Sequence, residues 1–264
     1  MSAAGPVSST RVAIVSGVGP GLGRSIALGL ARDGARCVLA ARREAELEKV
    51  AGEIRELGGD ALVVPTDITD DAQVEHLIAA TLDAYGRLDT LVNNAFVQPP
   101  LETLEAAELS TWEQAFAVNV FGTVRVTRAA IDALRADGGG NVVMINSMSA
   151  RRTRERFGVY SAAKAALLST ARTLALELGP DGIRVNSVVP GYVWGPNLEA
   201  WFTHRAEKRG VSVDDVYAEV AADNALHHLP TADEVADSVV FLASDRAAAI
   251  TGQTIDVNAG HWFH

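Results

Sequence analysis

Short apolar runs alternate with longer amphipathic stretches along most of the chain, and this alternation limits how the chain can fold. The apolar runs are rich in Val, Ile, Leu and Ala, which is typical of strands buried on both faces. The predicted strands cover residues 11–16, 36–41, 61–65, 88–93, 141–146, 184–189 and 254–257. Strands separated by helices pair in parallel through right-handed crossovers. We therefore expect an α/β fold in which a doubly wound parallel sheet forms the middle of three layers.

The stretches between the strands predict helices, because their apolar residues recur with helical spacing. The predicted helices cover residues 24–33, 44–57, 70–85, 111–135, 159–178 and 232–244. Residues 191–230 lose the alternation, and we interpret them as an irregular insertion, a substrate lid, at the carboxyl edge of the sheet, where ligands bind in such folds. No shift in composition marks a linker, so residues 11–264 are predicted to form a single domain after a disordered tail at residues 1–10.

Composition argues against several classes of function. The formal net charge of −10 disfavours a nucleic-acid partner and anchoring to an anionic membrane. No apolar run is as long as a membrane span, and residues 1–10 lack the apolar centre of a secretory signal. Cys37 is the only cysteine, so no intrachain disulfide can form, and we expect a cytoplasmic protein. The histidines lack cysteine or carboxylate ligands at usable spacing, so no metal site is predicted.

A glycine-rich turn joins the first predicted strand to the first predicted helix. Gly17, Gly19, Gly21 and Gly23 let the backbone turn sharply and approach a pyrophosphate, whose charge then lies at the helix N-terminus. The spacing differs from G-x-G-x-x-G, although Gly19 and Gly21 partly restore it. The order strand, turn, helix is the one that a dinucleotide site requires, which favours a Rossmann-like sheet. A tight turn without a ligand is the alternative.

Two arginines follow the second predicted strand, and they bear on the choice of cofactor. A carboxylate at this strand tip would hold the ribose 2′-hydroxyl of NAD, whereas an arginine suits the 2′-phosphate of NADP. Arg42 and Arg43 stand there without an acid, so NADP is favoured over NAD. In the alternative interpretation, the arginines open an exposed helix and pair with Glu46 or Glu48.

Two further strand ends carry residues that could line the adenosine side of a cleft. Asp67, after the third strand, could accept a hydrogen bond from the adenine amine or cap the following helix, and the sequence leaves both open. Asn93 and Ala95 end the fourth strand, where amide and small side chains could line the same side.

The chemistry is predicted to lie between residues 146 and 164. Tyr160 and Lys164 are four residues apart and therefore share one face of a helix. Ser147 follows a buried strand, so its hydroxyl could face the phenol and the ammonium. Such a pair also occurs by chance, and a core tyrosine with a satisfied hydroxyl is the alternative for Tyr160.

In their order and spacing, these motifs resemble the short-chain dehydrogenase/reductase (SDR) family, in its compact single-domain branch. The resemblance spans residues 11–259, and it rests on the glycine turn, Asn93-Asn94-Ala95, Asn119, Ser147, Tyr160-x-x-x-Lys164 and Pro190-Gly191. It implies an oxidoreductase that interconverts a secondary alcohol and a ketone with NADP or NAD, and a homotetramer. The implied catalytic tetrad is Asn119, Ser147, Tyr160 and Lys164. The expected cofactor contacts are Gly17, Gly19, Gly21, Leu22, Gly23, Arg42, Asp67, Ile68, Asn93, Ala95, Tyr160, Lys164, Pro190, Gly191 and Val193.

Elementary chemistry gives these residues roles. Hydride transfer to a carbonyl builds negative charge on its oxygen, and a free phenol with a pKa of about 10 gives up its proton reluctantly. The ammonium of Lys164, together with an oxidised nicotinamide, would lower the pKa of Tyr160, and Ser147 would polarise the substrate oxygen. The resemblance implies that Asn119 distorts its helix and anchors a water that relays protons to Lys164.

The chain departs from the family pattern at two positions. Phe96 stands where a glycine usually follows Asn-Asn-Ala, and its ring could narrow the mouth of the site or touch the substrate. Gly195 stands where the family commonly has a threonine after Pro-Gly, so a hydroxyl contact to the cofactor is lost.

Aromatic residues gather in the predicted lid and suggest a sizeable, partly apolar or aromatic carbonyl substrate. They are Trp194, Trp201, Phe202 and Tyr217, which Phe96 and Phe157 could join. In the alternative interpretation, these rings only pack the lid onto the body.

Four arginines, Arg151, Arg152, Arg154 and Arg156, lie between the predicted serine and tyrosine. They could bind a carboxylate or phosphate of the substrate, form ion pairs with a neighbouring subunit, or stay solvated, and all three remain open. The C-terminal segment resembles the subunit-contact edge of the family, and its tail could reach a neighbour's active site.

Two other classes of function compete with a small-molecule oxidoreductase acting on CH–OH donors. A catalytically silent nucleotide-binding sensor on the same fold should lack the tyrosine or the lysine, and this chain has both. A lyase or epimerase usually carries a longer C-terminal substrate domain, for which the chain has no room.

Overall fold

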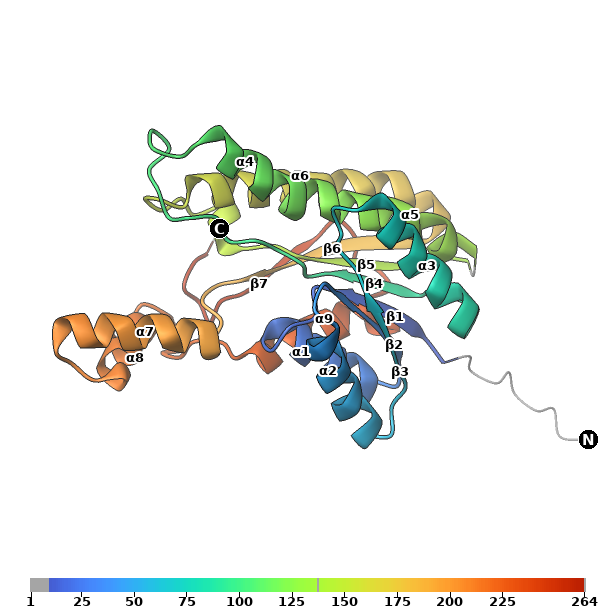
Figure 1. Cartoon of the computed structure of the whole chain (residues 1–264), viewed down its shortest axis with the longest axis horizontal. Helices are drawn as coiled ribbons and strands as arrows, with labels where there is room; N and C mark the ends of the chain where they lie inside the picture. The colour runs from blue at the N-terminus through green and yellow to red at the C-terminus, as the bar shows by residue number, and fades with distance from the viewer. Residues whose placement is uncertain (1–9, 137, 264) are drawn as a thin grey trace, which may run out of the picture.

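The computed structural model describes residues 10–136 and 138–263, so residues 1–9 of the predicted tail lie outside the described residues. The described strands form a parallel sheet in the order β3-β2-β1-β4-β5-β6-β7 (Figure 1). They are β1 (Val12–Ser16), β2 (Arg36–Ala41), β3 (Ala61–Pro65), β4 (Thr90–Asn93), β5 (Gly140–Ile145), β6 (Ile183–Pro190) and β7 (Thr254–Val257). The strand order changes direction between β1 and β4, and the predicted doubly wound parallel sheet is confirmed.

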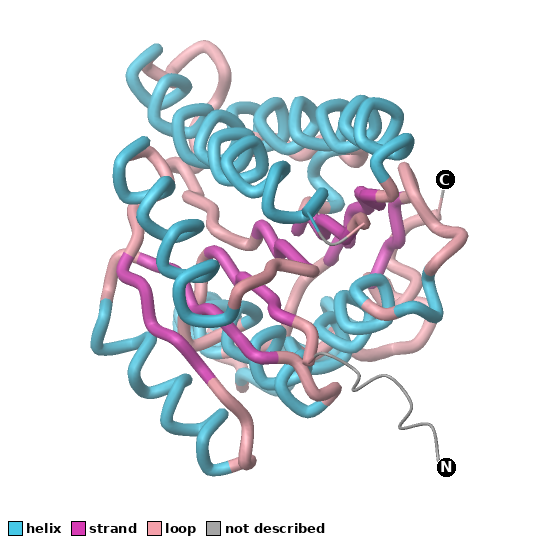
Figure 2. Tube along the Cα trace, turned by 90° about the vertical axis from the view of Figure 1, so that its right-hand side faces the viewer, coloured by secondary structure: helices cyan, strands magenta, loops and turns pink. Residues whose placement is uncertain are grey.

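Helices cover both faces of the sheet, as the two perpendicular views show (Figures 1 and 2). One face carries α1 (Leu22–Arg32), α2 (Glu44–Glu56) and α9 (Ala232–Ala243). The other face carries α3 (Asp71–Tyr85), α5 (Thr123–Ala136) and α6 (Gly158–Leu178). Within the described residues, no helix is both long enough and apolar enough to cross a membrane.

The central strand β1 shows why the strands read as continuous apolar runs. Ala13 and Val15 pack into the core under α1, α2 and α9, whereas Val12 and Ile14 pack into the core under α3, α5 and α6. Successive side chains of a strand point to opposite faces, so a strand between two helical layers needs an apolar residue at every position. All of β1 is buried as a result.

The helix predicted over residues 111–135 is wrong in its middle. The structure has α4 (Leu109–Phe116), then a π-helical turn, η1 (Ala117–Gly122), and only then α5. Three short 3₁₀ turns are also present: η2 (Met148–Ala150), η3 (Gly179–Asp181) and η4 (Asp245–Ala247).

The segment predicted to be irregular, residues 191–230, is largely helical. It contains α7 (Pro196–Arg209) and α8 (Val213–Ala221), which project together beyond the carboxyl edge of the sheet (Figure 1, orange). The Ser212 hydroxyl and the Asp215 carboxylate form a capping box that starts α8. Apolar side chains on the facing sides of α7 and α8 pair around the fully buried Phe202, so the two helices share a small core of their own.

Candidate active site

The four glycines of the turn between β1 and α1 fall into two pairs with different surroundings. A Cβ on Gly17 would collide with the backbone of Ala95, and a Cβ on Gly23 would collide with the Gly17 carbonyl oxygen. Gly19 and Gly21 instead face open space, because no atom lies within 4 Å of a Cβ built there. The first pair therefore allows the turn to approach β4 closely, and the second pair leaves room for a ligand.

The N-terminus of α1 fits a phosphate group. Gly21 is the N-cap residue and offers no side-chain cap, and the first turn of α1 carries no acidic residue. Free N–H groups and the helix dipole at such an end favour an anion. The residues present therefore fit the pyrophosphate of a dinucleotide.

Asn93, the last residue of β4, and Asn94, which follows it, make different hydrogen bonds. Asn94 donates from Nδ2 to the Gly17 carbonyl at 2.7 Å, which ties the glycine turn to the end of β4. Asn93 is 4% exposed and donates from Nδ2 to Thr127 Oγ1 at 3.0 Å, so its amide is directed into α5 rather than along the sheet edge. Asn94, which we did not single out as a contact residue, therefore has the more direct link to the predicted nucleotide site.

The arginines at the tip of β2 do not make the ion pairs of the alternative interpretation. Glu46 binds Lys49 at 2.9 Å and Glu48 binds Arg55 at 3.3 Å. Within residues 10–136 and 138–263, no carboxylate pairs with Arg42 or Arg43, and both side chains are exposed. A phosphate at this strand tip would meet two exposed guanidinium groups that form no salt bridge with a described residue.

Asp67 does not cap the helix that follows it. The N-cap residue of α3 is Asp70, whose carboxylate accepts from the Gln73 N–H at 3.0 Å. Asp67 instead accepts from the N–H and hydroxyl of Thr69, at 2.9 and 2.7 Å. These bonds, and the charge of Arg42, lower the pKa of Asp67, so it is an anion at neutral pH. The neighbouring Ile68 is buried against the turn at Gly122 and offers little side-chain surface.

The structure brings together the side chains of Ser147, Tyr160 and Lys164 at the carboxyl end of β5. The ammonium of Lys164 donates to the Ile145 carbonyl at 2.9 Å, and the side chain is 3% exposed. Its Nζ lies 5.8 Å from the ring centroid of Tyr160 and 5.8 Å from that of Phe96. The lysine therefore lies between two aromatic rings, with one backbone carbonyl as its hydrogen-bond acceptor.

Burial shifts the protonation of both groups toward the neutral form. It lowers the pKa of Lys164 to about 8 and raises the pKa of Tyr160 to about 12. The Ser147 hydroxyl lies within hydrogen-bonding reach of the phenol and acts on the Tyr160 pKa in the opposite direction. Without further positive charge, the phenol stays protonated at neutral pH and can only be a donor.

Asn119 lies in the π-helical turn η1, so the expected local distortion of its helix is confirmed. The side chain is fully buried, and its amide donates to the Val97 carbonyl at 2.9 Å and accepts from the Val97 N–H at 2.8 Å. It thereby holds the segment after β4 that presents Phe96, 54% exposed, edge-on to the Tyr160 ring at 6.5 Å.

The loop after β6 is held by the strand beside it. Gly191 donates from its N–H to the Val257 carbonyl at 3.3 Å, and a Cβ at Gly191 would lie 2.9 Å from that of Asn258. The Trp194 N–H donates to the Pro230 carbonyl at 2.7 Å. Pro190, Gly191 and Val193 therefore lie at the same edge of the sheet as the glycine turn, and their contact with a cofactor stays a prediction.

The aromatic residues of the lid pack mainly on one another. The Trp194 ring lies 5.5 Å from Phe202 and 4.8 Å from Tyr217, and all three belong to the small core of α7 and α8. Trp201 is the more exposed ring, at 42%. Phe96 and Phe157 have their ring contacts elsewhere, with Tyr160 and Arg154. Packing thus accounts for part of this cluster, while Trp194 and Tyr217 are half-buried and Trp201 is exposed, so contact of these rings with a substrate stays a prediction.

The arginine segment, residues 151–156, is not a uniformly solvated loop. Arg151 binds Asp256 of β7 at 2.7 Å, and the two side chains are only 16% and 14% exposed. Arg156 is 63% exposed and lies 3.9 Å from Glu155, an arrangement that contributes little to stability. The C-terminal tail lies on its own chain, since Trp262 packs under Arg152 and its carbonyl accepts from Asn258 at 3.1 Å.

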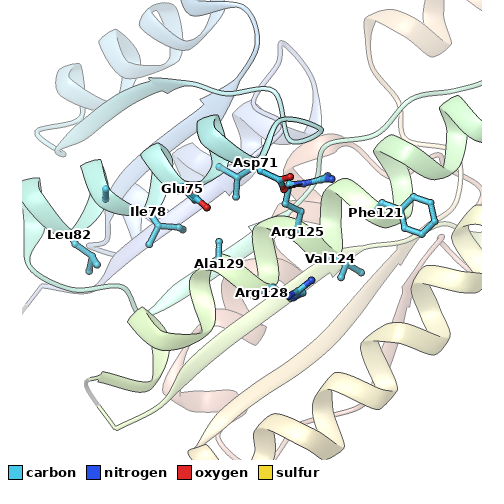
Figure 3. A pocket seen from close by; sticks show the side chains of 11 residues that line it. Asp71, Glu75, Ile78, Leu82, Phe121, Val124, Arg125, Arg128 and Ala129 are labelled. Carbon is cyan, nitrogen blue, oxygen red and sulfur yellow. Dashed lines mark hydrogen bonds and ion pairs between the residues drawn. The ribbon is translucent and has the colours of Figure 1, made fainter.

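A separate hollow of about 870 Å³ lies between α3 and α5 (Figure 3). Asp71 and Arg125 form an ion pair in its lining, with Ile78 and Leu82 to one side of the pair and Phe121 to the other. None of the residues that line it is a predicted site residue. No cluster of His, Cys, Asp and Glu in the described part of the chain could hold a metal ion.

Known proteins are similar to this chain in sequence and structure over nearly its whole length. The sequence model of the family described as "Enoyl-(Acyl carrier protein) reductase" matches residues 17–261. The short-chain reductase protein NovJ of Streptomyces niveus is 33% identical, over 96% of this chain and 95% of its own. An actinorhodin polyketide ketoreductase with NADPH superposes with a TM-score of 0.88 at 31% identity, covering 96% of this chain and 97% of its own. An NAD⁺-bound xylitol dehydrogenase superposes with a TM-score of 0.88 at 25% identity, covering 96% and 100%.

Proposed function

The chain belongs to the short-chain dehydrogenase/reductase family, and from this premise we propose that it interconverts a secondary alcohol and a ketone with a nicotinamide dinucleotide. One observation carries the proposal. A protonated phenol, a serine and a buried lysine meet at the sheet edge where Gly19 and Gly21 leave room for a dinucleotide. Two structural relatives hold NADPH or NAD⁺, and by name one is a polyketide ketoreductase and the other a xylitol dehydrogenase.

In this proposal Tyr160 is the acid and base of the reaction. The bound dinucleotide would supply or accept the hydride at the substrate carbon. In reduction, Tyr160 gives its proton to the substrate oxygen, and Ser147 donates a hydrogen bond to the same oxygen. In oxidation, the phenolate takes the proton back. Burial raises the pKa of the Tyr160 phenol, so nearby positive charge must stabilise the phenolate.

Lys164 supplies the positive charge that stabilises the phenolate, and Asn119 acts on the site without touching the substrate. The buried ammonium lies on the same helix face as the phenol and is anchored by the Ile145 carbonyl. Asn119 holds the Val97 backbone and, by resemblance to the family, would order the water that passes protons to Lys164. The lid of α7 and α8 would cover the substrate side of the cleft.

The assay that tests the proposal is a panel of neutral ketones and secondary alcohols, each with NADPH and with NADH. Oxidation or formation of the reduced nicotinamide is followed by absorbance. Turnover of at least one ketone or alcohol supports the proposal. Tight binding of a dinucleotide without turnover across the panel would favour the silent sensor instead.

NADP is the cofactor that we propose, because Arg42 is exposed at the tip of β2 and forms no salt bridge with any described residue. Arg42→Glu should lower the ratio of kcat/KM with NADPH to that with NADH on the order of 10- to 100-fold, since a charge-assisted contact to the 2′-phosphate becomes a repulsion. Lys49→Glu, the same charge change on the exposed side of α2, should leave the ratio unchanged. An equal ratio in wild type and Arg42→Glu would disprove the strand-tip argument.

Gly195 stands where the family commonly has a threonine, so restoring the threonine tests the hydroxyl contact to the cofactor that this chain lacks. Gly195 is the N-cap residue of α7 in an extended conformation, with open space where a side chain would stand and no side-chain cap. Gly195→Thr should stabilise the protein by about 0.5–1 kcal/mol and lower the Kd for the cofactor several-fold. Gly195→Ala is the control, because it restricts the backbone equally without adding a hydroxyl. If alanine lowers the Kd as much as threonine does, the hydroxyl is irrelevant.

We also propose a cytoplasmic homotetramer, as the resemblance implies. Exposed apolar side chains on the helical layer, Phe121 at 60% and Leu176 at 80%, are the kind of surface that subunit contacts cover. The single cysteine, Cys37, is buried, and burial raises the pKa of its thiol to about 12, so it is inert in a reducing compartment.

A further inference from the structure

Two guanidinium groups of the arginine segment are stacked on aromatic rings and have no carboxylate partner within the described residues. Arg154 lies 5.0 Å over the Phe157 ring and 5.2 Å over the Tyr192 ring. Arg152 lies 5.3 Å over the Trp262 ring. A ring face attracts a guanidinium and holds it in place, while the N–H groups along its edge stay available to an acceptor.

The rings under Arg154 come from two elements that frame the proposed proton donor. Phe157 is the N-cap residue of α6, three residues before Tyr160, so the two side chains lie one turn apart on the same side of the chain. Tyr192 follows β6 at the carboxyl edge of the sheet. Arg154 is therefore held between the helix that carries Tyr160 and the loop after β6.

A third basic group lies beside these two. The ring of His261 is 5.8 Å from that of Tyr192, and its Nδ1 is buried without a hydrogen-bond partner in the described part of the chain. Burial and the charge of Arg152 lower the pKa of His261, Asp223 raises it, and Arg154 lowers it further. The two arginines are thus close enough to act on this histidine, and His261 stays neutral and able to donate one hydrogen bond.

This basic cluster is unusual in an acidic protein. The net charge is −10, and several other arginines near the surface are paired with carboxylates: Arg24 with Glu53, Arg135 with Asp181, and Arg205 with Glu219. Arg152 and Arg154 keep their charge uncompensated next to the proposed site. An acceptor with two oxygens in one plane is the group that two stacked guanidiniums recognise best.

We propose that Arg152 and Arg154, with His261 beside them, form a site for a carboxylate carried by the substrate. The inference rests on the proposed alcohol–ketone chemistry at Tyr160 and adds the class of substrate, oxo acids and their hydroxy acids. The carboxylate lies between the two guanidiniums, and the carbonyl of the same molecule reaches Tyr160 and Ser147. Of the three roles left open for the arginine segment, these two residues take the substrate, whereas Arg151 fixes the segment to β7.

The test compares laevulinate with its methyl ester, which carry the same ketone with and without a charge. In the full-length enzyme with NADPH, the double variant Arg152→Gln/Arg154→Gln should raise KM for laevulinate on the order of 10- to 100-fold. The kcat for both compounds and the KM for the ester should change little. Arg156→Gln, an exposed arginine of the same segment, is the control and should change neither KM. Equal changes for acid and ester, or none, would overturn the proposal.

A binding measurement decides the case in which neither compound is turned over. Cyclohexanecarboxylate and cyclohexanecarboxamide are titrated calorimetrically into enzyme saturated with NADP⁺. The wild type should bind the carboxylate more tightly, and the double variant should lose that preference; a wild type without preference overturns the carboxylate site. Reduction of neutral ketones is scored separately. If no neutral ketone is reduced but the wild type still binds the carboxylate more tightly than the carboxamide, the alcohol–ketone function is wrong and the carboxylate site is supported.

Discussion

Tyr160→Phe should lower kcat for ketone reduction on the order of 1,000-fold or more, while the Kd for NADPH stays close to that of the wild type. The substitution removes only the phenolic oxygen. The ring and its edge-on contact with Phe96 remain, so the site keeps its shape and loses the proton that the substrate oxygen must receive. Steady-state kinetics and a fluorescence titration of NADPH measure the two quantities.

Tyr85→Phe is the matched control for this experiment. The Tyr85 hydroxyl donates to Asp60 at 3.1 Å at the far end of α3, and burial raises its pKa to about 12, as it does for Tyr160. The same chemical change there should leave kcat unaltered. A Tyr160→Phe enzyme that keeps a substantial fraction of the wild-type rate would mean that another group donates the proton.

The sheet could be predicted from the sequence because its strands are buried on both sides. A central strand such as β1 needs an apolar residue at each position, and that pattern is local. Strand ends were less well placed: β4 begins at Thr90, two residues after the predicted start. Leu88 is apolar and buried but lies before the ladder, and an apolar run does not show which of its residues are hydrogen-bonded.

The lid, residues 191–230, was predicted to be irregular but contains two helices, although its sequence carries a helical pattern. The apolar residues of α7 and α8 recur at helical spacing, as in Phe202 and Ala206, and the sequence from Ser212 to Asp215 is that of a capping box. The many charged residues between them obscured this pattern. Read as irregular, the segment suggested aromatic rings free to meet a substrate, whereas two short helices pack those rings against each other.

No pattern within residues 151–156 could have predicted which of these arginines bind other parts of the chain. Arg151 forms an ion pair with Asp256, and the guanidinium of Arg152 stacks on the Trp262 ring. Each of these partners lies more than a hundred residues further along the chain. A local distortion of the helix at Asn119 was expected from the family resemblance alone, and the structure shows that it is a π-helical turn. Long-range contacts decide which polar residues are structural and which stay available to a ligand.

Lys164→Met should lower kcat for ketone reduction on the order of 100-fold at pH 7 and abolish a pH dependence that the wild type shows. Burial lowers the pKa of Lys164 to about 8, so the ammonium is present below that pH and is lost as the pH rises through it. The developing phenolate of Tyr160 then loses its stabilising charge. The wild-type rate of reduction should therefore be level below pH 8 and fall above it, and the variant should show no such break. A rate profile of the wild type that stays level to pH 9.5 would contradict this role.

The lowered pKa of Lys164 also makes stability depend on pH, and this dependence distinguishes a catalytic from a structural effect of Lys164→Met. The unfolded lysine has a pKa of 10.5, so between pH 8 and 10.5 the unfolded chain binds a proton that the folded chain has released, and the stability of the wild type rises with pH across this window. Below pH 8 the full cost of burying the cation is present, up to about 3 kcal/mol at 1.36 kcal/mol for each pKa unit. Lys164→Met has no such cost and should melt at or above the wild-type temperature at pH 7, with a difference that shrinks toward pH 10.5. An enzyme that loses activity while gaining thermal stability has lost a charge required for the reaction, and not its fold; a variant that melts well below the wild type at pH 7 would instead assign the lysine a structural role.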